Sequence, residues 1–235
     1  MMLTCLLPVR NGAEDLPEYL NRALRFCDNI VALDDGSTDS TLEILKSTPG
    51  VELVLTNPRR ETYVGWNDRE NRQRLLNAAA NFGPDWVIWI DADEQLEESD
   101  SEVLRRFLEC DAEADKAYCF EVLRVIDDLQ TYDRHGFWVP RLYAYDRKLR
   151  LASEDLHLDL MPIQFTPDAR VKTSLRLLHK AGMTADRRQQ RYHKYLESDP
   201  DRRWLSENDY LRLLDPPKRT KRVKRRDPRD PVVLK

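Results

Sequence analysis

The first ninety residues alternate short apolar runs with amphipathic segments, and this alternation limits the possible folds more than any other feature of the chain. Each run has the length of a buried strand, and the segments between runs have helical length or spacing. Parallel strands that are joined by helical crossovers and buried on both faces produce this pattern. We therefore predict an α/β fold with a mostly parallel sheet and helices on both faces.

The boundaries of the elements follow from where each apolar pattern starts and stops. The expected strands are 3–9, 29–33, 51–56 and 86–90, and the expected helices between them are 16–27, 41–46 and 68–81. Asp15 is the expected N-cap of the first helix, with Pro17 in its first turn. Later expected elements are a helix near 101–108, a strand-like run at 117–125, and polar helices at 184–196 and 205–214. The second half is expected to be a smaller, irregular region appended to the sheet.

Composition excludes several classes of protein. No apolar run approaches the roughly 18 residues of a membrane-spanning helix. The first residues lack the cationic start and small-residue cleavage site of a signal peptide, so we expect a cytoplasmic protein. The four cysteines are scattered without C-x-x-C spacing, so neither a disulfide framework nor a zinc site is indicated.

The charge is distributed unevenly along the chain. Residues 216–235 contain nine Lys or Arg and two Asp, a net +7, whereas residues 1–215 contain 29 basic and 40 acidic residues, a net −11. A basic segment without apolar periodicity is expected to be disordered on its own. Such a tail is either a solubilising end or an arm that binds polyanions or an anionic membrane surface.

Two acidic segments follow predicted strands at the same edge of the sheet. They are Asp-Asp-Gly-Ser at 34–37 and Asp-Ala-Asp-Glu at 91–94. The carboxyl ends of parallel strands border the ligand crevice of open α/β sheets, so both segments are expected to line one cleft. The first segment also has the composition of a turn followed by a helix cap. This structural interpretation and the interpretation as a ligand-binding segment have equal weight.

The second segment points to a cation. Three acids in four positions repel one another unless a cation offsets them, and Mg²⁺ binds through carboxylates together with substrate phosphates. The sequence contains no glycine-rich phosphate loop, so a diphosphate would have to be held by metal. Three arginines, Arg69, Arg72 and Arg74, lie on the preceding helix. The preferred interpretation is a solvated helix face, and the alternative is that one of them reaches the diphosphate as a fixed positive charge.

These segments, in their order and spacing, resemble the family 2 nucleotide-sugar glycosyltransferases, which have the GT-A fold. The resemblance is carried by Pro-Val-Arg-Asn at 8–11, by Asp-Asp-Gly-Ser-Thr-Asp at 34–39, and by 85–94, which include the Asp-x-Asp motif. It covers 3–98 closely and extends more faintly to 141–143, His157 and 178–182. It implies a nucleotide-sugar-binding half at 1–98, an acceptor-binding and catalytic half at 99–215, and the tail at 216–235.

The resemblance also implies roles for individual residues and a metal-dependent, inverting sugar transfer. Pro8 and Arg10 would border the nucleotide pocket, Asp35 would hydrogen-bond the donor base, and Asp91 would face the ribose or metal. Asp93 would bind Mn²⁺ or Mg²⁺ at the diphosphate of a nucleotide-sugar donor, expected to be a UDP-sugar. The metal would offset the charge that grows on the leaving nucleoside diphosphate.

An inverting transfer needs a carboxylate that deprotonates the acceptor hydroxyl. The candidates are Glu154, Asp155 and Asp159, of which Asp155 is preferred because the Glu154–Asp155 pair resembles the acidic pair of many family members. A cytoplasmic subgroup instead has His followed by Glu, whereas His157 is followed by Leu158.

A histidine and the aromatic residues of 132–145 have alternative roles. His179 is either a satisfied structural histidine or, as the resemblance implies, a third metal ligand. Trp138 could form a sugar-stacking platform or lie in the core, and for most of this residue and its neighbours the core is preferred. These neighbours are Tyr132, Phe137, Tyr143 and Tyr145.

Two further functions remain as alternatives to glycosyl transfer. A nucleotidyltransferase also pairs aspartates with a metal, but 8–12 match its glycine-rich loop poorly. A non-catalytic polyanion-binding protein would use only the tail. For a transferase the tail suggests a polyanionic acceptor, either modified DNA such as a hydroxymethylated base or a lipopolysaccharide-type glycan.

Overall fold

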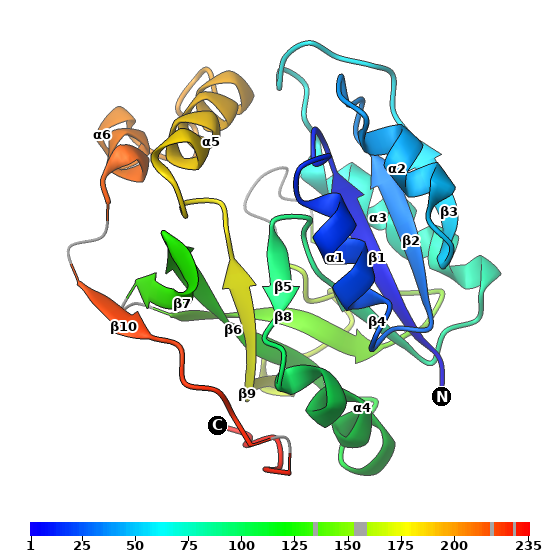
Figure 1. The fold of residues 1–235 in the computed structure, drawn as a ribbon. Coiled ribbons are helices and arrows are strands. Elements are labelled where there is room, and N and C mark those ends of the chain that lie inside the picture. The colour runs from blue at the N-terminus through cyan, green and yellow to red at the C-terminus, as the bar shows by residue number, and fades with distance from the viewer. Residues whose placement is uncertain (134–135, 153–158, 217–218, 228) are drawn as a thin grey trace.

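Figure 1 shows the computed structural model of the chain, which describes residues 1–133, 136–152, 159–216, 219–227 and 229–235. The strands are β1 (Leu3–Val9), β2 (Asn29–Asp34), β3 (Val51–Thr56), β4 (Trp86–Trp89), β5 (Glu94–Leu96), β6 (Ala117–Ile126), β7 (Asp128–Asp133), β8 (Phe137–Ala144), β9 (Arg170–His179) and β10 (Thr220–Arg222). The helices are α1 (Leu16–Ala23), α2 (Thr41–Ser47), α3 (Asp68–Ala78), α4 (Asp100–Cys110), α5 (Ala185–Ser198) and α6 (Glu207–Leu211). Short 3₁₀ turns occupy Ala79–Asn81, Pro167–Ala169 and Arg212–Leu214.

The N-terminal half is a parallel sheet in the order β4, β1, β2, β3. Strands β1, β2 and β4 are buried throughout or nearly so, as their apolar runs predict. Since these three strands run in the same direction, their carboxyl ends meet at one edge of the sheet. Residues 10, 35 and 91 therefore come together there.

Alternate residues of β1 face two different cores. Leu3, Cys5 and Leu7 belong to the core that also contains the buried residues of α1 and α4. Leu6 belongs to the core on the other side, where Leu75 of α3 packs. Helices thus cover both faces of the sheet, as Figure 1 also shows, and the predicted α/β fold class is confirmed.

The second half continues the sheet, in contrast to the irregular region expected. Strand β8 pairs antiparallel with β4, β6 with β8, and β9 runs parallel to β6 and antiparallel to β5. The sheet of the described residues has ten strands. The long strands β6 and β9 were missed as a pair because their contacts join segments about fifty residues apart in sequence. None of the described helices is both long and apolar enough to cross a membrane.

The described residues of the basic tail pack on the body, which corrects the expectation of disorder. Strand β10 pairs antiparallel with β7, and Val232 packs against the larger core. Arg226 forms an ion pair with the fully buried Asp100. Backbone pairing and ion pairs with the acidic body order this segment, and neither produces an apolar periodicity in the sequence.

Candidate functional site

A cleft of about 610 Å³ opens at the carboxyl ends of β1, β2 and β4, and β8, β9 and α5 complete its walls. Six residues predicted from the sequence line it together: Pro8, Arg10, Asp35, Asp91, Asp93 and His179. The prediction that both acidic segments share one cleft is therefore confirmed.

The first acidic segment serves both as a turn and as part of the cleft wall. The Asp34 carboxylate accepts a hydrogen bond from the backbone N–H of Ser37 at 3.2 Å, which is the turn interpretation. Asp35 faces the cleft, where it accepts hydrogen bonds from Arg60 and from Asn57. Gly36, which follows Asp35, has a φ of +73°, and a Cβ there would meet the carbonyl oxygen of Pro58 at 2.2 Å. Glycine is thus required for this turn.

Aromatic rings and cations form the wall beside Asp35. The Arg10 guanidinium lies 4.1 Å from the centre of the Tyr63 ring and donates to the carbonyl of Arg60 at 2.7 Å. From α5, the Lys194 ammonium lies 4.3 Å from the Trp66 ring and 5.7 Å from the Tyr63 ring. These contacts hold cationic groups at the cleft surface through their attraction to ring faces.

Arginines offset most of the second acidic segment. Arg72 donates to Asp91 at 2.8 Å, and Arg141 donates to Glu94 at 2.6 Å and to Asp91 at 3.5 Å. Burial alone would raise the pKa of Asp91, but Arg72 and then Arg141 hold that pKa below its ordinary value. Arg72 is buried, paired also with Asp68, and this corrects its interpretation as part of a solvated face. Arginine side chains thus supply most of the positive charge that offsets the three neighbouring acids.

Asp93 has a different partner. Its Oδ2 lies 3.4 Å from Nε2 of His179, and both side chains are partly exposed to the cleft. Burial alone would raise the pKa of Asp93, but His179, and then Lys194 and Arg191, hold it well below its ordinary value. Strand pairing sets the two residues side by side, because His179 pairs with Glu94 and the backbone N–H of Lys180 donates to the carbonyl of Asp93 at 2.8 Å.

The described side chains of the cleft leave two of the three predicted metal ligands, Asp93 and His179, without an arginine partner. Within the described residues, no three or more His, Cys, Asp or Glu side chains gather where they could share a metal ion. Both oxygens of Asp91 face arginines, so only Asp93 and His179 of the predicted ligands stand free of such ion pairs with arginine. Nδ1 of His179 is buried without a hydrogen-bond partner among the described residues.

Two of the three candidate bases lie outside the described residues. Glu154 and Asp155 fall within 153–158, as does His157. Asp159 lines the cleft, and its carboxylate forms an ion pair with Arg170 of β9.

Helix α5 contributes cleft residues that the sequence analysis missed. Gln190, Arg191 and Lys194 line the cleft together with Arg187. Residues 187, 191 and 194 follow helical spacing, and this one-sided row of cations was the available signal. Arg187 joins α5 to the start of α1, because it donates to both carboxylate oxygens of Asp15 at 2.8 and 3.0 Å.

Asp15 therefore has another role than the one expected. At the N-cap of α1, where all residues are described, its side chain makes no capping hydrogen bond. It binds Arg187 and the ammonium of Lys180, which is 2.7 Å away and buried. The pairs fix the segment between β9 and α5 against the N-terminal half.

The aromatic residues of 132–145 divide between cleft and core. Trp138 and Phe137 line the cleft, and the indole N–H of Trp138 donates to the carbonyl of Thr173 at 3.0 Å. Tyr143 is fully buried and its hydroxyl accepts from Trp89 at 2.7 Å, so its expected place in the core is confirmed.

Solved structures share this architecture. S. aureus TarS superposes with a TM-score of 0.50 at 17% identity over 91% of this chain and 42% of that chain. A structure of TarS 1–349 in complex with UDP also gives 0.50, at 16% identity over 91% of this chain and 70% of the other. At such identities the likeness concerns the fold.

Sequence comparisons give the family. An uncharacterized protein of Mycobacterium tuberculosis and one of Mycobacterium bovis are each 29% identical over 219 residues, covering 87% of this chain. The chain spans about half the length of these relatives, 52% in each case. The family profile described as "Glycosyl transferase family 2" matches residues 4–160, two thirds of the chain. On this match, the chain belongs to glycosyl transferase family 2.

Proposed function

We propose that this chain transfers a sugar from a nucleotide-sugar donor to an acceptor hydroxyl, with inversion at the anomeric carbon and with a divalent cation. The observation that carries the proposal is that Arg10, Asp35, Asp93 and His179 line the same cleft at the carboxyl ends of the parallel strands. Family membership favours glycosyl transfer over the nucleotidyltransferase alternative. The UDP complex of a structure with the same fold supports a UDP-sugar as the donor.

The donor's nucleoside would lie in the part of the cleft at the carboxyl ends of β1 and β2. Pro8 and Arg10 border this part of the cleft, and Asp35 is buried with its carboxylate facing the cleft. Asp35 already accepts from Arg60 and Asn57, and a carboxylate has about four acceptor positions, so it retains room for a base N–H. The Tyr63 ring beside Arg10 adds an apolar surface to the same wall.

The diphosphate would lie between Asp93 and α5. Arg191 and Lys194 of α5 act electrostatically on Asp93, and Asp91 is turned toward arginines. Cations on a helix wall attract phosphate oxygens. They would share with the metal the charge of the leaving nucleoside diphosphate.

Asp93 and His179 fit a divalent cation as two of its ligands, one oxygen and one nitrogen. Donor phosphate oxygens and water would complete the set, and an imidazole ligand suits Mn²⁺ better than Mg²⁺. When bound, the cation supplies Lewis-acid stabilisation of the leaving diphosphate. Asp91, which the resemblance places at the ribose or metal, would act chiefly through Arg72 and Arg141.

The base accepts the proton of the acceptor hydroxyl. At the same time the hydroxyl oxygen bonds to the anomeric carbon, and the nucleoside diphosphate leaves from the opposite face. We propose Asp155 for this role, with Glu154 beside it. The ion pair of Asp159 with Arg170 favours a structural role for Asp159.

Exchange of the base should affect turnover and leave donor binding nearly unchanged. We expect Asp155→Asn to lower kcat by about a hundredfold or more, because general base catalysis contributes about 10² to 10⁴ in rate. The change in donor affinity should be small. Steady-state kinetics of Asp155→Asn, Glu154→Gln and Asp159→Asn would compare the candidates. If Asp159→Asn alone loses turnover, the base is Asp159.

The acceptor is proposed from charge. Exposed cations remain among the described residues of the tail, including Lys221, Arg222 and Arg225. They favour a polyanionic acceptor, either modified DNA or an anionic glycan, through sequence-independent attraction. Once the donor is known, transfer to hydroxymethylated DNA and to lipopolysaccharide-type glycans would be compared directly.

A thermal-shift screen tests the donor proposal before any acceptor is known. UDP and UDP-sugars should raise the Tm in the presence of Mn²⁺, because ligand binding to the native state at 100 times Kd stabilises it by about 2.7 kcal/mol. Slow, metal-dependent release of UDP from a UDP-sugar should accompany binding. Shifts that persist in EDTA would contradict the metal. If no sugar nucleotide binds but DNA does, the chain is the alternative polyanion-binding protein.

A further inference from the structure

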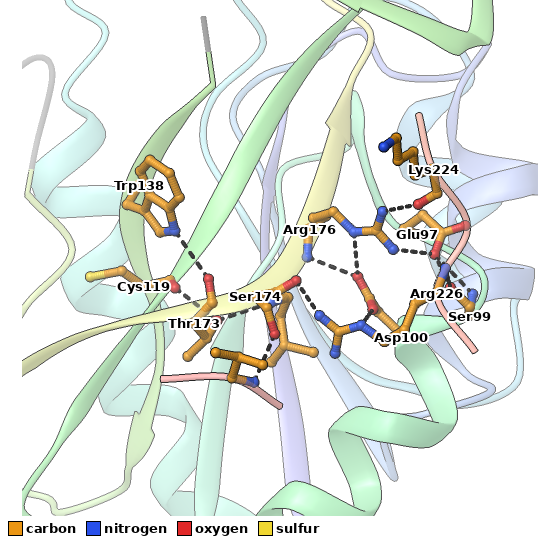
Figure 2. A network of polar contacts seen from close by, with 12 residues as sticks. Glu97, Ser99, Asp100, Cys119, Trp138, Thr173, Ser174, Arg176, Lys224 and Arg226 are labelled. Carbon is orange, nitrogen blue, oxygen red and sulfur yellow. Dashed lines mark hydrogen bonds and ion pairs between the residues drawn. The ribbon is translucent and has the colours of Figure 1, made fainter. Parts of the chain in front are cut away.

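A wholly buried carboxylate lies away from the cleft, at the start of α4. Asp100 is 0% exposed and is bound by arginines from two distant parts of the chain. Arg176 of β9 donates its backbone N–H to Oδ2 at 3.0 Å and its Nε–H to the same oxygen at 3.2 Å. Arg226 of the tail approaches Oδ1 with Nε at 3.3 Å. Figure 2 shows the two guanidinium groups on either side of this carboxylate.

Each arginine also binds a second segment. Arg176 donates to Glu97 at 2.9 Å and to the backbone carbonyl of Lys224. Arg226 donates to the carbonyl of Ser174 at 2.5 Å, and its backbone N–H donates to the hydroxyl of Ser99 at 3.2 Å. We call Glu97, Ser99, Asp100, Ser174, Arg176 and Arg226 the clasp (Figure 2).

The tail continues along β9 beyond the clasp. The backbone N–H of Ser174 donates to the carbonyl of Val233 at 3.0 Å, and the N–H of Val233 donates to the Ser174 hydroxyl at 2.9 Å. Thr173, beside Ser174, holds the indole of Trp138 in the cleft wall. The tail therefore contacts β9 between Lys172 and Arg176.

The clasp joins the same two segments that carry the Asp93–His179 pair. Glu97 lies four residues after Asp93, and Arg176 lies three residues before His179. Between the clasp and the pair, β5 and β9 hydrogen-bond to each other, with Leu96 opposite Leu177 and Glu94 opposite His179. A displacement of β9 at Arg176 would thus change the separation of the two side chains that we propose as metal ligands.

We infer that the tail positions the metal-binding pair through Arg226, which makes it a working part of the catalytic unit. Arg226 is a positioning residue, since it contacts Asp100, Ser99 and Ser174 and does not line the cleft. The part of this inference that concerns metal and donor affinity rests on the proposed function. The coupling of the tail to β5 and β9 stands on the geometry alone.

Two neighbouring tail arginines provide a matched comparison. Arg225 carries the same charge as Arg226, but its side chain is 82% exposed and its contact with Glu98 spans 4.0 Å. Arg225→Gln and Arg226→Gln therefore remove the same charge from the tail, and Arg226→Gln alone opens the clasp. Phe82→Leu, in the core on the other side of the sheet, serves as a variant with reduced stability and an intact clasp.

Hydrogen–deuterium exchange of the free protein tests the coupling without any ligand. In Arg226→Gln, amide exchange at 94–97 and 177–180 should rise by about tenfold or more, whereas Arg225→Gln should match the wild type. Mn²⁺-dependent UDP binding should weaken by about 10- to 100-fold in Arg226→Gln, the range found for groups that orient metal ligands. Arg226→Lys retains the charge beside Asp100 and should restore part of both effects.

Specific results would overturn the inference. One is equal exchange and equal UDP affinity in Arg226→Gln and Arg225→Gln. Another is the same loss of affinity in Phe82→Leu at a matched decrease in Tm, which would make the effect one of general stability. Should Arg226→Gln fail to fold, the same exchange measurement on Arg226→Lys and Ser99→Ala decides whether the tail is coupled to β5 and β9. If the wild type binds no UDP, the proposed function fails, and the exchange data still decide the coupling.

Discussion

Replacing Asp93 with alanine should abolish metal-dependent donor binding and lower turnover by about a thousandfold or more. Lewis-acid stabilisation of a leaving diphosphate is worth several kcal/mol, and each 1.36 kcal/mol is a factor of ten in rate. Asp93 is partly exposed in the cleft and faces His179, so its removal takes away one of the two proposed ligands. Calorimetric titration of UDP with and without Mn²⁺, together with turnover, would measure both effects.

The fold should survive this change. Asp93 belongs to none of the hydrophobic clusters, and among the described residues its carboxylate has no arginine partner of the kind that Asp91 and Glu94 have. Asp115→Ala removes an exposed carboxylate away from the cleft and is the control, with no expected effect on binding. Wild-type transfer by Asp93→Ala with an unchanged metal requirement would rule out Asp93 as a ligand.

The N-terminal half was predictable because burial on both faces leaves a direct record in sequence. A strand such as β1, with helices on each side, must be apolar at nearly every position, and its ends are marked by turn residues. The acidic residues that follow β2 and β4 then fall at one edge by topology alone. The order and direction of the strands are therefore enough to predict that Asp35 and Asp93 line one cleft.

The ion pairs of the site could not be predicted in the same way. Three arginines lie within six residues of α3, and of these Arg72 is the one that reaches Asp91. Arg69 donates instead to the carbonyl of Ala152, and Arg74 donates to Asn57. Which arginine faces the cleft depends on how α3 docks on the sheet. The Arg141 contact depends likewise on β8 pairing with β4.

The tail shows a second limit of sequence patterns. Its nine basic residues and lack of apolar periodicity are typical of a disordered, polyanion-binding arm. In the structure Arg226 is largely buried at Asp100, and β10 adds to the edge of β7. A single buried partner on a distant helix is enough to change the role of a basic residue, and no local pattern encodes that partner.

Replacing Arg141 with methionine should destabilise the protein by about 3 to 5 kcal/mol, the usual cost of removing one partner from a buried ion pair. Arg141 and Glu94 are 8% and 3% exposed, and their contact spans 2.6 Å. Methionine fills much of the same space, so the cost comes mainly from the carboxylate left without its cation. Urea unfolding would measure the loss. Arg212→Met breaks an exposed pair with Asp209 and should cost at most about 1 kcal/mol.

The loss should depend on pH in a direction that identifies its cause. Burial already raises the pKa of Glu94 above its ordinary 4.5, and Arg141 is the largest influence that lowers it. Without Arg141 the pKa of Glu94 in the folded state rises further, so the folded variant binds this proton more tightly than the unfolded chain does. Protonation of Glu94 therefore contributes stability to the variant below the pKa that Glu94 has in the unfolded chain. This contribution is lost as the pH rises through the pKa that Glu94 has in the folded variant. The difference from the wild type should therefore be smaller near about pH 5 than near about pH 8.

A double variant separates charge from packing. Glu94→Gln in the Arg141→Met background removes the buried charge, and it should recover part of the stability and abolish the extra pH dependence, since residues in direct contact are not additive. An equal deficit at both pH values would instead assign the loss to packing.

The same network holds Asp91 through Arg72. The stability of Arg72→Met should therefore be affected far less by Glu94→Gln, because the carboxylate partners of Arg72 are Asp68 and Asp91. That contrast would show that Arg141 chiefly neutralises Glu94, although it also contacts Asp91, whereas Arg72 neutralises Asp91, which leaves Asp93 as the acid available for a metal ion.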